Sequence, residues 1–456
     1  MTTDRHALSQ ANIVGYASGN FGKNILWNTL EIFLIFYLTD ILGVNPAKAG
    51  LIVLLSVIWD ALLDPLVAVS ADKTQSRWGK YGPYIMIGAP LASLSFMAIF
   101  LMGHWGLSMP FFVVVAMIMV FRMAYTIIDL PHNALIARVT RDGHVRSRIA
   151  ITRFMFSATG SFTLSIASIA IFSAPTPQGQ AENFLIFAYI AALLSLGAMW
   201  VSWFSVRRFD IEGPAGQINL VDIPRALGVV LRHRNGLIVL SLAFISGMSL
   251  PIFGRMLSYY SKYYLDDFNY QWAVWPSMID LDVVISTQNC VGYALAALMM
   301  GQFLFSFVLL RGAKYLTKAQ ILRLSHGIIV MAMIIFAVWP PHRLWGLVSI
   351  AFIVGLGSAG IWSVIWGMAP DIVDQIESQY GFRPEGMFIG CTIVFMKLAN
   401  GLGNGLMGAS LDALGYVANA VQSPLTLKGL HIISWGWPIL GSVACIGLLQ
   451  IYREGR

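Results

Sequence analysis

The chain has 456 residues, of which 57% are hydrophobic and only 11% are charged. A soluble protein usually carries about 25% charged residues, and its helices need only one apolar face, so this composition argues against a soluble fold. The net charge of +7 indicates basic loops beside a membrane rather than a nucleic-acid-binding surface. The three cysteines lie far apart, in no disulfide or metal-ligand spacing. The N-terminus has no pattern of a cleaved signal peptide.

Apolar runs, each long enough to cross a bilayer as a helix, follow one another along the chain with short polar breaks. The longest break, 207–236, separates six runs from six. We therefore predict an all-α membrane protein with two six-helix bundles, 1–206 and 237–456, and a cytoplasmic linker between them. The twelve predicted transmembrane helices are 16–41, 50–71, 82–103, 110–137, 150–173, 185–206, 237–263, 289–310, 320–339, 344–368, 386–412 and 429–451.

Lysine and arginine predict the orientation. If the N-terminus is cytoplasmic, the loops on the opposite side hold only Lys48, Arg343 and Lys428. Because basic residues concentrate in cytoplasmic loops, we expect a multi-pass protein of the bacterial inner membrane with both termini in the cytoplasm.

Several charged side chains lie inside the predicted spans, where each costs about 2.5–3.5 kcal/mol on insertion scales. Such groups persist when they pair with one another or line a wet cavity, and pairing alone is the alternative for any single one. They are Lys23, Arg122, Arg153, Arg255, Lys262, Lys397, Glu31, Asp60, Asp64 and Asp129.

The first span carries a polar stripe. Asn20, Asn24, Asn28 and Glu31 lie within roughly 80° around a helix axis, and Lys23 lies at the edge of this stripe. A one-sided polar stripe in a membrane helix faces protein or water. Hydrogen bonding between helices is the alternative explanation for the asparagines.

Asp60 and Asp64, four residues apart in the second span, share a helix face. Two adjacent carboxylates repel each other, and the pKa of one rises unless a cation lies between them. Asp129 in the fourth span, with Thr126 one turn earlier on the same face, could join them. The pattern predicts a site that gains and loses a cation.

In the second half, Lys397, Asn400 and Asn404 share a face of the eleventh span, and Trp362 and Trp366 share a face of the tenth. Aromatic rings can stack on the C–H faces of sugars, by extension of their known behaviour. Packing between helices is the alternative explanation for these tryptophans.

A set of short motifs occurs in order through both halves, from residue 13 to the last span. On these motifs the chain resembles the glycoside–pentoside–hexuronide:cation symporter family of the major facilitator superfamily. They are Gly-Asn-Phe-Gly-Lys-Asn (19–24), Tyr-Leu-Thr-Asp (37–40), Trp-Asp-Ala-Leu-Leu-Asp-Pro (59–65), Arg-Trp-Gly-Lys-Tyr-Gly-Pro-Tyr (77–84), Asp-Leu-Pro (129–131), Arg153-Phe154 and Pro-Asp-Ile-Val-Asp (370–374).

The resemblance implies a secondary active symporter that moves a sugar, glycoside or sugar acid with a cation by alternating access. It implies a cation site at Asp60, Asp64 and Thr126, with Asp129 beside them. The cytoplasmic stretch from Asp72 through Arg77 to Lys80 matches the superfamily's gating loop, although it could also be a simple basic anchor. The residues that match sugar contacts are Lys23, Asp129, Arg153, Trp362 and Lys397.

The chain departs from the melibiose-transporting pattern of that family at three positions. Asn24 replaces an aspartate, Leu63 an asparagine that binds sodium, and Asn133 a tryptophan. The last change argues against melibiose, and the loss of a carboxylate at position 24, which Glu31 could restore, favours a sugar acid. We therefore include Asn24, Glu31 and Asn133 in the predicted substrate site. Because Leu63 offers no oxygen, a proton is favoured over sodium as the coupling ion.

Three alternatives remain open: a sodium-coupled sugar symporter, a transporter of lysolipids or other amphiphiles with the same fold, and a non-transporting membrane receptor. An enzyme is not expected, since the sequence has neither an HExxH nor a GxSxG motif. No cofactor or metal is expected beyond the coupling ion. The expected partners are a small sugar or sugar acid and membrane lipid, with no nucleic acid, and a monomer is expected to function.

Overall fold

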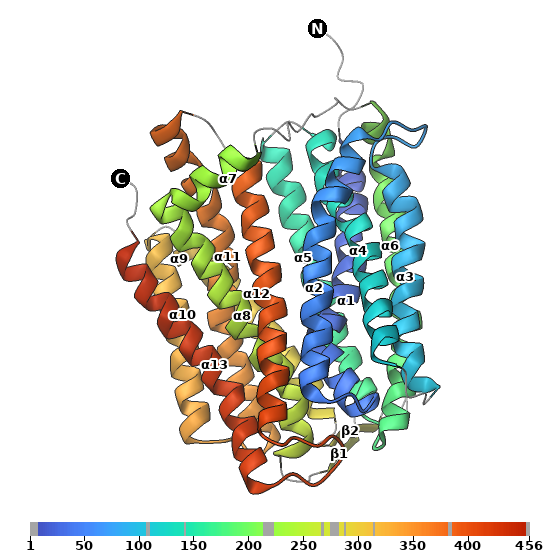
Figure 1. Ribbon diagram of the computed structural model, residues 1–456, viewed down its shortest axis with the longest axis vertical. Coiled ribbons are helices and arrows are strands. Elements are labelled where there is room, and N and C mark those ends of the chain that lie inside the picture. The colour runs from blue at the N-terminus through green and yellow to red at the C-terminus, as the bar shows by residue number, and fades with distance from the viewer. Residues whose placement is uncertain are drawn as a thin grey trace. The chain divides into compact units, whose positions relative to one another are not determined.

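The computed structural model describes residues 8–105, 110–140, 143–212, 223–265, 269–273, 282–286, 289–312, 315–381 and 385–452. Within this part of the chain, one long helix coincides with each predicted span (Figure 1). These helices are α1 (Gln10–Phe36, continued by the π-helical turn η1, Tyr37–Ile41), α2 (Pro46–Lys73), α3 (Gly82–His104), α4 (Phe111–Val139), α5 (Gly143–Ile171), α6 (Pro177–Glu212), α8 (Arg234–Tyr263), α9 (Cys290–Gly312), α10 (Lys318–Val338), α11 (Leu344–Tyr380), α12 (Glu385–Ala413) and α13 (Pro424–Ile451).

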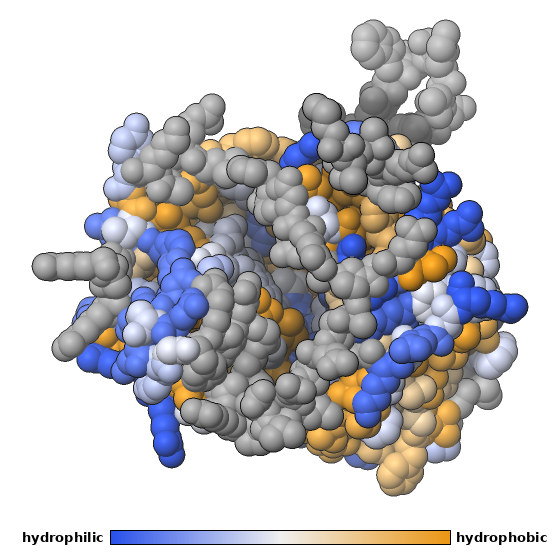
Figure 2. Space-filling model, turned by 90° about the horizontal axis from the view of Figure 1, so that it is seen from above, coloured by the Kyte–Doolittle hydropathy of each residue, from blue (hydrophilic) through white to orange (hydrophobic). Residues whose placement is uncertain are grey.

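The surface of these helices suits a lipid environment. Ten of the helices in the described ranges are long and apolar enough to cross a membrane, and α1 and α12 are not among them. Both carry polar residues of the predicted site, such as Asn24 on α1 and Lys397 on α12, as expected of helices that face protein or water. Elsewhere large apolar side chains are exposed, such as Leu62 (63%) and Leu193 (69%). Figure 2, which views the molecule from above, shows many hydrophilic side chains on this face. The prediction of an all-α, multi-pass membrane protein is confirmed.

The contacts divide the chain into two compact units. One consists of Met1–Glu31, Leu55–Leu164 and Ala181–Ile218, and the other consists of Ile32–Leu54, Ser165–Gln180 and Asn219–Arg456. Helix α1 therefore contributes its first part to one unit and its end to the other. The division into bundles 1–206 and 237–456, which rests on the order of the spans, stays a prediction.

Close helix packing inside the second unit depends on glycine. A Cβ atom at Gly355 of α11 would meet the backbone of Leu298 in α9, and a Cβ atom at Gly301 of α9 would meet the backbone of Phe352 in α11. Small residues let membrane helices approach to backbone contact, where dispersion forces hold them together. The two glycines thus explain why α9 and α11 pack directly against each other.

A short helix and a pair of short strands were not predicted. Helix α7 (Ile223–Arg232) lies within the predicted linker 207–236, whose residues 213–222 are outside the described ranges. Strands β1 (Asn269–Ala273) and β2 (Asp282–Ser286) form an antiparallel pair between α8 and α9, with Asn269 opposite Ser286. All three elements are too short to stand out among apolar runs of membrane-spanning length.

Candidate functional site

The polar stripe of α1 faces α5. The Asn20 amide donates to Ser157 Oγ over 3.3 Å. Further along the helix, Asn28 donates to Ser161 Oγ at 2.8 Å, and Ser161 donates to Asn24 Oδ1 at 2.9 Å. The stripe thus faces protein, as hydrogen bonding between helices requires. All three asparagines remain partly exposed, so they can also contact a small polar ligand.

Two cations and one carboxylate meet beside this stripe. Lys23 Nζ lies 2.6 Å from Asp129 Oδ1 and 3.1 Å from Asn133 Oδ1. The Arg153 guanidinium donates from Nη2 to the same Asn133 oxygen, and from Nε to Asn20 Oδ1 at 2.8 Å. Lys23 is 3% exposed, whereas the Asp129 side chain keeps 27% of its surface exposed. Four of the predicted substrate residues therefore come together, namely Lys23, Asp129, Asn133 and Arg153. Asp129 is more accessible than its ion-pair partner Lys23.

Glu31, predicted as a substrate residue, forms an ion pair with Arg122 of α4, with 3.2 Å between Oε1 and Nη2. The guanidinium of Arg122 also lies over the ring of Trp27, 4.6 Å from its centroid. Arg122 is 1% exposed. A buried pair of this kind satisfies both charges in a medium of low dielectric constant. In the structure Glu31 therefore takes part in an ion pair that joins α1 to α4.

The predicted cation site is assembled from α2 and α4. The Thr126 hydroxyl donates to Asp60 Oδ1 and lies 3.4 Å from Asp64 Oδ1. Asp60 is fully buried, and Asp64 is 8% exposed. The fourth predicted member, Asp129, forms its ion pair with Lys23. Among the described residues, no group of three or more His, Cys, Asp and Glu side chains is arranged to hold a metal. Asp60, Asp64 and Thr126 offer carboxylate and hydroxyl oxygens, which suit a proton or a small hard cation.

The predicted residues of the second half lie in the other unit. Trp362 of α11 and Lys397 of α12 are both partly exposed. One turn from Lys397, Asn400 accepts a hydrogen bond from the guanidinium of Arg255, a residue of α8 that is 2% exposed. Asn404 donates to the same oxygen of Asn400 at 3.0 Å. The polar face of α12 therefore packs against a buried arginine of α8.

The predicted gating loop joins α2 to α3. Arg77 is exposed and lies over the ring of Trp78, whereas Lys80 is 7% exposed and lies over the ring of Tyr81. The side chain of Asp72 is outside what the structure describes. Nothing in this arrangement tests the gating role, which stays a prediction.

Asp210, near the end of α6, holds this loop and was not predicted. Its carboxylate accepts hydrogen bonds from the backbone N–H groups of Tyr81, at 3.0 Å, and Gly82, at 2.8 Å. Arg138 of α4 lies 3.6 Å from the same carboxylate and donates to the Asp210 carbonyl at 2.7 Å. Gly79 has φ +88°, and a Cβ atom there would meet the Asp210 side chain. The glycine in the Arg-Trp-Gly-Lys motif is thus required both by its backbone conformation and by this contact.

Other site residues were missed as well. Ser157 and Ser161 gave no signal, because serine is common in membrane helices and their partners are far away in the sequence. Arg122 did give a signal, as a charge inside a span, but its partner Glu31 was assigned to the substrate. The two residues lie on the first and fourth predicted spans, and the sequence alone does not show that these spans pack together.

The fold and this polar interior define a secondary transporter of the major facilitator superfamily. A family model described as MFS/sugar transport protein matches residues 15–287 and 281–454. The chain belongs to that family, the glycoside–pentoside–hexuronide:cation symporters. It is therefore a membrane transporter rather than an enzyme, and its family moves small sugars together with a cation.

Individual relatives match over nearly the whole chain. The uncharacterized symporter YnaJ of Bacillus subtilis is 25% identical, with 98% of this chain and 92% of that protein covered. The glucuronide carrier protein homolog of Escherichia coli is 24% identical, with 93% and 88% covered. The isoprimeverose transporter of Lactiplantibacillus pentosus is 24% identical, with 95% and 87% covered.

Among solved structures, the nucleoside transporter NupG is similar with a TM-score of 0.66 and 14% identity, covering 97% of this chain and 100% of that chain. At this identity the likeness supports the fold alone.

Proposed function

We propose that the chain is a sugar-acid symporter of the bacterial inner membrane, driven by protons, with both termini in the cytoplasm. Alternating access would move the bundles 1–206 and 237–456 against each other, and a monomer would suffice. The observation that carries this proposal is the charge around Asn133. Lys23 and Arg153 both donate to its side-chain oxygen, while Asp129 supplies a single carboxylate. Two cations beside one anion leave a positive site that favours an anionic sugar.

The hydrogen bonds of Arg153 support a carboxylate ligand. Its Nε and Nη2 atoms now donate to the amide oxygens of Asn20 and Asn133. A substrate carboxylate could accept from both atoms at once, in the bidentate geometry that arginine offers. The glucuronide carrier protein homolog of Escherichia coli is a relative whose name refers to a sugar acid, which supports the same class of substrate. Asp129 would then accept from sugar hydroxyls, and Trp362 and Lys397 would contact the sugar from the second half.

For the coupling ion, Asp60, Asp64 and Thr126 are the proposed ligands, with Asp129 as a neighbour. A proton needs only one carboxylate to bind it, without the set of oxygen ligands that a metal cation requires. Sodium is the second candidate, since the Thr126 hydroxyl lies within 3.4 Å of an Asp64 oxygen and adds an oxygen to the two carboxylates. Leu63 contributes none.

Purified protein should be screened by thermal shift against uronates, neutral glycosides, pentosides and a lysophospholipid, each with and without sodium. We expect the largest stabilisation from a uronate. Stabilisation by the lysophospholipid alone would contradict the proposal and favour an amphiphile transporter.

Arg153→Ala should abolish the stabilisation by the uronate and reduce its uptake into vesicles at least tenfold. Arg148→Ala is the matched control, because Arg148 lies on the same helix, is exposed and bonds to Gln10. Uptake by Arg153→Ala at the rate of the unmodified protein would disprove the assignment.

A further inference from the structure

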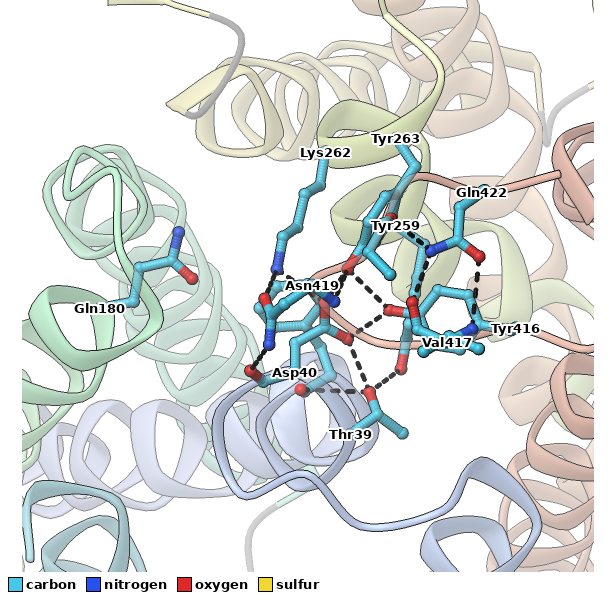
Figure 3. Close-up of polar contacts among 12 residues, drawn as sticks. Thr39, Asp40, Gln180, Tyr259, Lys262, Tyr263, Tyr416, Val417, Asn419 and Gln422 are labelled. Carbon is cyan, nitrogen blue, oxygen red and sulfur yellow. Dashed lines mark hydrogen bonds and ion pairs between the residues drawn. The ribbon is translucent and has the colours of Figure 1, made fainter. Parts of the chain in front are cut away.

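The motif Tyr-Leu-Thr-Asp (37–40) has no place in the transport site described above. In the structure it forms η1, the π-helical turn that ends α1, and Thr39 and Asp40 within it are buried. Short π-helical turns are frequent at functional sites. A dense set of polar contacts surrounds Asp40 (Figure 3), and we call its members the Asp40 network. They are Thr39, Asp40, Tyr259, Lys262, Tyr263, Tyr416 and Asn419.

The carboxylate of Asp40 is surrounded by donors. Its Oδ1 accepts from Lys262 Nζ at 2.7 Å and from the Tyr263 hydroxyl at 2.5 Å. Its Oδ2 accepts from the Tyr416 hydroxyl at 2.7 Å and from Thr39 Oγ1 at 2.8 Å. Since a carboxylate has about four lone-pair sites, its capacity to accept hydrogen bonds is filled. These donors fit an anion whose counter-ion is Lys262.

The loop between α12 and α13 is held to the same centre. Asn419 accepts from Lys262 Nζ at 2.6 Å and donates from Nδ2 to the backbone carbonyl of Asp40 at 2.8 Å. Its φ of +58° is a left-handed conformation that asparagine adopts more readily than most residues. Gln422 fixes the loop through hydrogen bonds to the backbone of neighbouring loop residues. The loop is therefore shaped to present Asn419 to Asp40.

Tyr416, from the same loop, is a dependable donor. Burial, and then the nearby Asp40 carboxylate, raise the pKa of Tyr416 well above its usual value of 10. The phenol therefore keeps its proton at any physiological pH and can hold its hydrogen bond to Oδ2. Tyr259 adds a further contact, with its hydroxyl 2.8 Å from Thr39 Oγ1.

We propose that the Asp40 network is a latch, which ties the end of α1 to the end of α8 and to the α12–α13 loop and which opens once in each transport cycle. The latch rests on the proposed function, in which residues 37–40 belong to the bundle 1–206 and the other members belong to the bundle 237–456. The contacts of the network lie within the second compact unit, which includes the end of α1. Alternating access moves such bundles against each other, so contacts that link them cannot persist through the cycle. The latch is made of polar groups, which can exchange their partners for water when they separate.

The first test measures how often the latch opens and needs no substrate. With the three buried cysteines replaced by alanine, Thr39→Cys becomes a reporter that a maleimide in detergent solution can label only when the network separates. Tyr416→Phe removes one hydrogen bond to a charged group and should raise the labelling rate about tenfold or more. Tyr260→Phe is the matched control, because Tyr260 lies on α8 but bonds to Pro341, outside the network. Equal labelling of Tyr416→Phe and Tyr260→Phe would overturn the latch.

The second test asks whether transport requires opening, and it rests on the proposed function because it uses methyl β-glucuronide as the transported probe. Thr39→Cys and Tyr259→Cys are joined by a short bis-maleimide, which replaces their contact by a covalent link. We expect cross-linking to abolish uptake while binding of the probe, measured by thermal shift, persists. Undiminished uptake after complete cross-linking would overturn the latch. Absence of any uptake by the unmodified protein would instead count against the proposed substrate, and the labelling test would then decide on the latch alone.

Discussion

Glu31 of α1 and Arg122 of α4 form an ion pair about two helical turns from the pair that Lys23 and Asp129 form between the same helices. The polarity is reversed between the two pairs, since α1 supplies the cation in one and the anion in the other. If α1 slid along α4, each charge would lose its partner in a medium where an unpaired charge is expensive. The two pairs therefore fix the register of α1 on α4, and with it the positions of Lys23 and Asp129.

The first prediction follows from this arrangement. Glu31→Gln or Arg122→Leu alone leaves one buried charge without its ion-pair partner and should destabilise the protein by about 3–5 kcal/mol. The double variant removes both charges and should recover much of that loss. Thermal unfolding of the four proteins in detergent gives the coupling between the two residues. Additive losses in the double variant would mean that the pair contributes little to stability.

The second prediction concerns the charge of the site. Asn133→Asp would place a carboxylate between Lys23 and Arg153 at nearly unchanged volume. The site would then carry two cations and two anions, and uronate binding should weaken at least tenfold. Asn133→Leu is the control, because it removes the amide without adding a negative charge and should weaken binding less. Titration of both variants by calorimetry makes the comparison. Tighter uronate binding by Asn133→Asp would contradict a positive site.

The sequence alone was enough to predict the parts of the structure that depend on local pattern. Runs of membrane-spanning length placed the twelve long helices, and spacing on one helix placed Asp60 beside Asp64. The parts that depend on distant partners were missed. Asp210 binds a backbone N–H 129 positions away, and Tyr416 binds Asp40 across 376 positions. No local periodicity marks such contacts. Glu31 was included in the predicted substrate site because its carboxylate could restore the one absent at Asn24, whereas its ion pair with Arg122 became evident only with α4 in place.

The third prediction concerns the loop that Asp210 holds. Neutralising Asp72 and Arg77 together should lower the rate of transport more than it weakens ligand binding, because a gating loop acts on the movement between states rather than on the site. Lys73→Gln is the control, since it removes a positive charge just before the loop without touching either residue. Uptake rates and thermal-shift affinities should be measured on the same preparations. Equal uptake rates would leave the loop with only an anchoring role.

The last prediction concerns the coupling ion. Asp60 is fully buried, and Thr126 bridges it to Asp64. If one carboxylate of this pair carries the coupled proton, Asp60→Asn or Asp64→Asn should abolish accumulation against a gradient. Exchange of labelled for unlabelled substrate, which needs no net ion movement, should persist in Asp64→Asn.

Uptake into sealed vesicles should be measured first under an imposed pH gradient and then under an imposed sodium gradient at fixed pH. We expect the pH gradient alone to drive accumulation, because Leu63 supplies no oxygen to complete a sodium cage. Accumulation driven only by sodium would show that sodium is the coupling ion, with Thr126 as one of its ligands. Accumulation that survives in the Asp60→Asn, Asp64→Asn double variant would move the coupling site elsewhere in the chain.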